Sequence, residues 1–287
     1  MLVGAMNHPA ENVIDEIKWM AEMDLDFVDL TLEPPEAAVW KVDANAIRKA
    51  LADHGLDVIG HTAYYLPLAS PFESLRRAAV EELKRCLEVF GKVGAKWMNL
   101  HPDGKAPLHD KNFHVERNLQ TLRELLPVGR DCGVGLIIEN LPGKWNTVLE
   151  LSRLLEPLPE IGLHLDIGHA NLMVEKNTTE ELLSIYGPRL RHVHLHDNKG
   201  GSADLHLPLG SGTMEIPYHI RSLKKAKYDG TITLEVFCED RHYLEYSRDL
   251  LRHWWEELAV PPPEKPKLAV TTTASGQYST SNARSEE

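Results

Sequence analysis

The chain has 287 residues, of which 43% are hydrophobic and 26% are charged, as expected for a folded protein with a large core. Its formal net charge of −12 repels a polyanion at long range and argues against a nucleic-acid partner. No run approaches the roughly 20 apolar residues of a membrane span, and the first residues lack the basic and apolar regions of a signal peptide. We therefore expect a cytoplasmic protein.

Short apolar runs alternate along the chain with amphipathic segments. We expect strands at 2–6, 27–31, 57–61, 96–101, 135–139, 162–166, 192–196 and 231–237. Helical patterns fall between them, at 12–23, 44–54, 72–93, 111–132, 146–155, 179–186, 216–226 and 243–258. Asp43, and Thr178 or Thr179, stand where caps would begin two of these helices. Eight strands alternating with eight helices indicate βα units and a parallel sheet.

The length and the strand composition favour one α/β domain, a (β/α)₈ TIM barrel over residues 1–258. Runs such as GLIIE and ITLEVF are apolar on both faces, which is typical of strands covered by helices outside and packed inside a barrel. Eight units in about 250 residues match that fold. A doubly wound open sheet fits the same alternation, but no G-x-G-x-x-G follows the first strand.

The last residues of the chain and the cysteines say little about the function. Residues 259–287 are rich in Pro, Ser and Thr and cannot bury enough apolar area, so we expect a disordered tail, with a regulatory or partner role as the alternative. The three cysteines, Cys86, Cys132 and Cys238, form no C-x-x-C pair and are interpreted as reduced thiols in or near the core.

Nine acidic and histidine side chains fall at or just beyond predicted strand ends. A barrel brings these ends together in one mouth. Carboxylates crowded there would raise each other's pKa unless a cation neutralises them, and their motifs contain no matching Lys or Arg. Imidazoles beside carboxylates suit zinc, manganese or cobalt, so the pattern predicts a divalent metal site. The nine are His61, His101, Glu139, Asp166, His169, His194, Asp204, His206 and Glu235.

Each of these residues has a simpler interpretation. A strand-end histidine such as His61 or His101 is, taken singly, more often a hydrogen-bonded structural residue than a ligand. Glu139 and Glu235 are harder to dismiss, because a glutamate inside an apolar strand is costly unless it is paired or metal-bound.

Eight of the other histidines are interpreted as structural, supporting or surface residues. His192 and His196 flank His194, and we expect the three not to share one face of their strand, with the outer two structural or supporting the ligands. We expect six more at the solvated surface, namely His54, His109, His114, His219, His242 and His253.

With these motifs the chain resembles the xylose-isomerase-like barrel superfamily, which contains sugar phosphate isomerases and epimerases and also endonuclease IV. The strings HVHLHDNKG and DLHLPLGSGTM look much like the sugar enzymes. Epimerase-like members hold one metal with four ligands, which match Glu139, Asp166, His194 and Glu235. The resemblance implies that Glu139 and Glu235 also act as acid and base across the substrate carbon.

Endonuclease IV adds five ligands and holds three zinc ions. The added ligands match His61, His101, His169, Asp204 and His206, and the resemblance implies that Glu139 bridges two metals. We therefore expect one to three zinc, manganese or cobalt ions per chain. The chain departs from the endonuclease in ENLPGKW, which follows Glu139, and in His196, where the endonuclease has Asn.

Three functions remain open at this stage. We favour a metal-dependent sugar or sugar-phosphate isomerase or epimerase that acts through an enediolate. The alternatives are an endonuclease IV-like multi-zinc phosphoesterase, acting on abasic DNA or a small phosphate ester, and a non-catalytic metal-binding barrel. Related sugar enzymes often form dimers or tetramers, so a homo-oligomer is open too.

Several residues beyond the strand ends are candidates for substrate binding. Lys144, Lys199 and Arg241 could bind a substrate phosphate or hydroxyl, or be solvated loop cations. Trp145, Tyr64 and Tyr65 could wall the pocket or serve ordinary packing.

Overall fold

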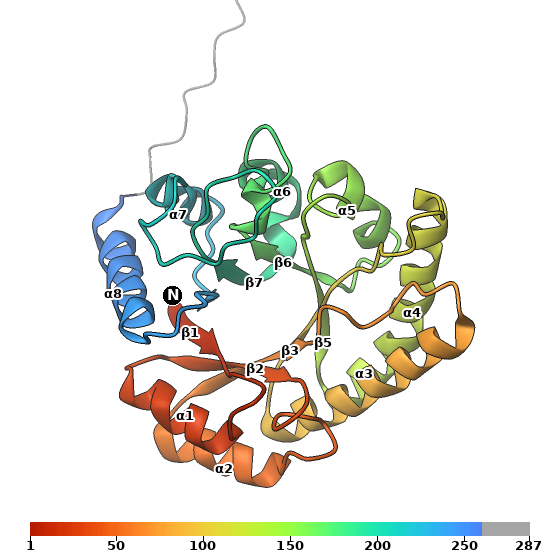
Figure 1. The fold of residues 1–287 in the computed structure, drawn as a ribbon, viewed down its shortest axis with the longest axis horizontal. Helices are drawn as coiled ribbons and strands as arrows, with labels where there is room; N and C mark the ends of the chain where they lie inside the picture. Colours follow the sequence, from red (N-terminus) through yellow and green to blue (C-terminus); the bar gives the residue numbers. More distant parts are fainter. Residues whose placement is uncertain (260–287) are drawn as a thin grey trace, which may run out of the picture.

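Eight parallel strands close into a barrel in the computed structural model, which describes residues 1–259. Each strand pairs with its neighbour in chain order, and β8 returns to pair with β1 (Figure 1). The predicted parallel barrel is confirmed, and the open-sheet alternative is excluded. The strands are β1 Leu2–Met6, β2 Phe27–Leu32, β3 Asp57–Thr62, β4 Trp97–Leu100, β5 Gly135–Glu139, β6 Gly162–Asp166, β7 Leu190–Leu195 and β8 Thr231–Leu234.

A ring of helices surrounds the strands (Figure 1). Short 3₁₀ turns at His169–Asn171 and Gly187–Arg189 flank the sixth helix. Among the described residues no helix has the length and apolar character needed to cross a bilayer. The helices are α1 Val13–Glu22, α2 Ala44–His54, α3 Glu73–Val93, α4 Lys111–Cys132, α5 Val148–Leu155, α6 Thr179–Tyr186, α7 Ile216–Lys225 and α8 His242–Glu257.

The first residues of three helices show whether their side chains cap the helix. Asp43 caps α2 by accepting hydrogen bonds from the backbone N–H groups of Asn45 and Ala46, as predicted. Thr178 precedes α6, but its side chain makes no capping hydrogen bond. A full capping box, formed by Thr147 and Glu150, begins α5.

Apolar side chains between the strands and the helices form the main core. In α1 the buried positions Val13, Ile17 and Met20 follow the helical repeat and face the barrel. The strands and the helices approach each other closely at Gly60 of β3, where an added Cβ atom would lie 2.7 Å from the ring of Phe90 in α3. Glycine at this position therefore lets α3 pack directly on the strand.

Two of the six histidines expected at the surface are buried, so that part of the prediction is wrong. His114 lies on the inner side of α4, with its Nε2 2.9 Å from the carbonyl oxygen of Ala106. His219 lies on the inner face of α7 beside Ile220. Both fall in the helical repeat of their buried neighbours, a signal the sequence contained. The other four are exposed as predicted, namely His54, His109, His242 and His253.

The cysteine prediction is confirmed. All three are free, and Cys86 is buried in α3. Burial raises the pKa of the Cys86 thiol to about 12, so this side chain is inert as a nucleophile. The predicted tail, 259–287, falls outside the described residues except for its first position.

Candidate metal centre

The C-terminal ends of the strands surround a cavity of about 930 Å³. Its position agrees with the usual place of active sites in this barrel fold. Asp166 and His194 are fully buried and do not line the cavity, but they contact residues that do. The other seven predicted ligands line it, namely His61, His101, Glu139, His169, Asp204, His206 and Glu235.

One group of ligand atoms lies at the ends of β3, β4 and β5. The Nε2 atoms of His61 and His101 are 3.2 Å apart, and the second is 3.0 Å from Oε2 of Glu139. Two nitrogens bound to one tetrahedral zinc at about 2.05 Å would lie about 3.3 Å apart. The observed separation of the two imidazole nitrogens is compatible with a shared ion and equally with a hydrogen bond between the rings.

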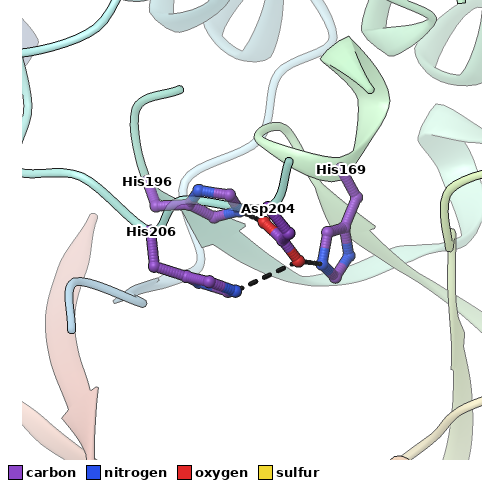
Figure 2. A group of neighbouring side chains, drawn as sticks. All are labelled: His169, His196, Asp204 and His206. Atoms are coloured by element: carbon purple, nitrogen blue, oxygen red, sulfur yellow. Dashed lines mark hydrogen bonds and ion pairs between the residues drawn. The ribbon is translucent and has the colours of Figure 1, made fainter. Parts of the chain in front are cut away.

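A second group lies beyond β6 and β7, where Asp204 stands between two imidazoles (Figure 2). Its Oδ2 is 3.0 Å from Nε2 of His169 and 3.1 Å from Nε2 of His206. His196 joins them, with its Nε2 3.7 Å from Oδ1 of Asp204. The four side chains offer ligand atoms within 4.8 Å of one another.

Glu139 connects the two groups. Its Oε2 faces His101, while its Oε1 is 3.0 Å from Nδ1 of His169. The same nitrogen is 3.3 Å from Oδ2 of Asp166. Glu139 therefore contacts both groups of ligand atoms, and the bridging of two metals that the resemblance to endonuclease IV implies stays a prediction.

His194 connects the remaining ligands. Its Nδ1 is 3.2 Å from Oε2 of Glu235 and 3.9 Å from Oδ2 of Asp166. All nine predicted ligands are therefore joined by a continuous set of contacts, although their roles as ligands stay a prediction.

The donor chemistry fits a divalent cation. Oδ2 of Asp166, Nδ1 of His101 and Nε2 of His196 are buried and have no hydrogen-bond partner. Burial lowers the pKa of His61 to about 3, so its imidazole is neutral at pH 7, as a metal ligand must be. Burial alone would raise the pKa of Glu139, but the imidazoles of His164 and His101 outweigh it and hold that pKa well below its usual range. Burial would lower the pKa values of His169, His194 and His206, but the carboxylates beside them outweigh it and raise these values, so a divalent cation would take the place of the protons held there. Mixed nitrogen and oxygen donors suit zinc, manganese or cobalt.

The expectation that three histidines of one strand do not share a face is wrong. Residues two apart in a strand point to the same side, and His192, His194 and His196 all turn inward. His192 and His194 both reach Asp29, while His196 reaches Asp166 at 3.4 Å. His196, which follows the end of β7, lies within the second ligand group rather than only behind it.

Sequence reasoning missed three polar residues inside the barrel. Asp29 is a buried acid within the apolar strand FVDLTL, the same signal that marked Glu139. Asn99 donates from Nδ2 to Oε2 of Glu139 at 2.6 Å. His164 is buried in β6, and neither of its ring nitrogens has a hydrogen-bond partner.

The three basic side chains that were predicted to bind substrate lie in different places relative to the cavity. Arg241 lines the cavity, where its guanidinium donates to Glu16 at 2.7 Å and lies 3.9 Å from the ring centre of Trp19. Lys144 and Lys199 are exposed and are not among the lining residues.

Of the three aromatic candidates, Tyr64 lines the cavity. Tyr65 donates to Glu33 instead, and Trp145 is buried in the core. Phe237, which sequence reasoning did not single out, stacks on His206 with ring centres 4.4 Å apart.

The structure is a (β/α)₈ barrel with histidine and carboxylate side chains gathered at its strand ends in groups that could hold a metal ion. The model of the xylose isomerase-like TIM barrel family matches residues 17–258, and the chain belongs to this family. The predicted family and fold are thereby confirmed.

Relatives of known sequence include enzymes of two kinds. An uncharacterised protein of Methanocaldococcus jannaschii is 29% identical over 74% of this chain and 75% of its own length. A probable endonuclease 4 of Aquifex aeolicus is 28% identical over 80% of this chain and 89% of its own length. The fructoselysine 3-epimerase of Escherichia coli O157:H7 is 24% identical over 75% of this chain and 82% of its own length. These matches support the prediction of an enzyme.

Solved structures show the same fold. A D-tagatose 3-epimerase-like protein superimposes with a TM-score of 0.79 and 23% identity, covering 89% of this chain and 97% of its own. The IOLI protein, solved with a bound zinc atom, gives a TM-score of 0.76 at 14% identity, covering 89% and 98%. At these identities the likeness establishes the fold alone.

Proposed function

We propose that this protein is a metal-dependent isomerase or epimerase that acts on a small polyhydroxylated carbonyl compound. Glu139 and Glu235 serve as its acid and base. The observation that carries this proposal is that two buried glutamates, from β5 and from just beyond β8, face one cavity that also holds the histidine ligands. The sugar epimerases among the relatives and the structural neighbours support the same reaction class.

The reaction removes one proton from carbon and adds another. A divalent cation bound by Glu139, Asp166, His194 and Glu235 would polarise the substrate carbonyl and make the adjacent C–H acidic. One glutamate removes that proton to leave an enediolate, and the other returns a proton to the opposite face or to the neighbouring carbon. We assign Glu139 as the base because its carboxylate lines the cavity and Asn99 fixes its Oε2 by a hydrogen bond.

Solvent exchange tests this proposal. Protein loaded with zinc, manganese or cobalt is incubated in D₂O with a panel of ketohexoses, and NMR follows loss of the C–H signal beside the carbonyl. Glu139→Gln and Glu235→Gln should each slow exchange by about 10²–10⁴-fold, because each removes a group that transfers a proton. Glu160→Gln is the matched control, since Glu160 is an exposed partner of Arg130. Wild-type exchange rates in both glutamine variants would contradict the assignment of Glu139 and Glu235 as acid and base.

A second candidate is a multi-metal phosphoesterase. It is favoured by the two ligand groups, which could hold separate ions as in phosphoryl-transfer sites. The relatives named probable endonuclease 4 point the same way. Against a DNA substrate stands the charge of −12, and Arg241, the one lysine or arginine described as lining the cavity, is already paired with Glu16.

Cleavage assays separate the two candidates. The metal-loaded protein is offered a duplex with one abasic site and a chromogenic phosphodiester, with and without a chelator. The favoured reading predicts ketose exchange without cleavage. Chelator-sensitive cleavage with no exchange would replace it by the phosphoesterase.

A further inference from the structure

Asp29 lies inside the barrel and is not among the residues that line the cavity. It comes from the middle of β2 and is fully buried. Its Oδ2 is 2.8 Å from Nε2 of His194, a residue of β7. Since β2 and β7 are not neighbours in the closed barrel, this contact crosses the barrel interior.

The two nitrogens of His194 therefore face different partners. Nε2 faces Asp29, whereas Nδ1 faces the carboxylates of Glu235 and Asp166. A carboxylate oxygen accepts, so in the neutral imidazole that a metal requires, a hydrogen bond at Nε2 places the single ring proton there and leaves the lone pair on Nδ1.

Asp29 is itself held in place by further polar side chains. Thr233 donates from Oγ1 to Oδ2 of Asp29 at 2.9 Å, and Nε2 of His192 lies 3.4 Å from the same oxygen. The other ring nitrogen of His192 is 2.7 Å from Oγ1 of Thr231. A buried carboxylate with three neighbours on one oxygen has little freedom to turn away from His194.

We propose that Asp29 is a positioning residue of the metal centre: it fixes the ring of His194 with Nε2 protonated, so that Nδ1 is the nitrogen offered to the metal. This inference rests on the proposed metal centre and is independent of which reaction the centre performs. Carboxylates that orient a ligating imidazole typically change metal affinity about 10–100-fold when removed. Asp29 would act through His194 and would not touch metal or substrate.

Asp29→Asn is the most informative variant because it keeps the shape of the side chain. The asparagine amide can donate to Nε2 of His194, which moves the ring proton to Nδ1 and blocks the ligating nitrogen. Asp26→Asn is the matched control, since Asp26 precedes the same strand. It accepts from the backbone N–H of Val3 and from Arg252, and it contacts no histidine.

Two measurements on the full chain test the proposal. Zinc affinity is determined by competition with a chromophoric chelator, and the ring ¹⁵N shifts of His194 are recorded in the zinc-loaded protein. We expect wild type and Asp26→Asn to share one affinity and an Nδ1-bound, Nε2-protonated ring. Asp29→Asn should bind zinc about 10–100-fold more weakly, with a changed ring signal.

Equal zinc affinity and equal ring shifts in the two asparagine variants would overturn the role of Asp29, whether or not the protein is an epimerase. If Asp29→Asn does not fold, Thr233→Val gives a milder test, because it removes the hydroxyl that donates to Asp29. It should weaken zinc binding by a smaller factor, and an unchanged affinity would contradict the proposal. Normal zinc binding by the wild-type protein without ketose exchange would instead refute the proposed reaction, and it would leave the comparison of zinc affinities to decide the role of Asp29.

Discussion

Arg241 shows how the surroundings of one side chain set its role. Its guanidinium lines the cavity, yet it is paired with the buried Glu16 and lies over Trp19. A cation that is already neutralised suits a hydroxyl or carbonyl oxygen better than a phosphate dianion. At this scale the structure favours an uncharged part of the substrate near Arg241.

We expect Arg241→Met to raise the KM for a turned-over ketose by about tenfold while kcat changes less than about twofold. A loss of about 1.4 kcal/mol in binding corresponds to tenfold, and removal of uniform binding affects KM alone. Steady-state kinetics measure both constants. Lys176→Met is the control, since Lys176 is an exposed cation with one distant partner, Glu180. An unchanged KM would remove Arg241 from the substrate site.

The buried face of helix α7 contains a histidine. The inner face of α7 consists of Ile216, His219, Ile220 and Leu223, so a titratable ring sits among aliphatic side chains. Burial lowers the pKa of His219 to about 4, and Glu180 opposes this shift only partly. The folded state therefore holds His219 neutral, whereas the unfolded chain protonates it near pH 6.5.

The free energy of unfolding should depend on pH because the pKa of His219 is lower in the folded state than in the unfolded chain. Because the unfolded chain binds the extra proton between about pH 6.5 and pH 4, the free energy of unfolding falls as the pH falls through this window. The full contribution of His219 is up to about 3 kcal/mol. His219→Leu should lose less stability than wild type between pH 7 and pH 4.5 in denaturant titrations.

His253→Leu is the control for this experiment, because His253 is exposed on α8. It should retain the wild-type pH dependence. Parallel curves for wild type and His219→Leu would show that His219 is not the group responsible.

The existence of every strand and helix could be predicted, because hydrophobic periodicity is a local property. The ends were less certain. β7 ends at Leu195 and β8 at Leu234, so His196 and Glu235 stand just beyond strands that were expected to contain them. Periodicity cannot reveal where strand pairing stops, since that depends on the neighbouring strand.

At the scale of the whole molecule, strand ends far apart in sequence meet in one mouth. The nine candidate ligands could be selected from the sequence because a (β/α)₈ barrel brings the C-terminal ends of all its strands together at one end. Asp29 carried the same local signal as Glu139, but its contact with His194 could not be predicted, because His194 lies 165 residues away across the barrel interior. Lys144 and Lys199 were candidates because loops follow strands, but the direction of a loop side chain depends on packing that the sequence pattern does not encode.

The central claim of this account is that the mouth of the barrel binds divalent metal. Elemental analysis of the purified protein, after loading with zinc, manganese or cobalt and exhaustive dialysis, tests it most directly. We predict at least one ion per chain, and a reduced content in His194→Ala. One ion would favour the site of Glu139, Asp166, His194 and Glu235, whereas two or three would bring in the His61–His101 and His169–His206 groups. A wild-type protein that retains no stoichiometric metal under any of the three loadings would contradict the account.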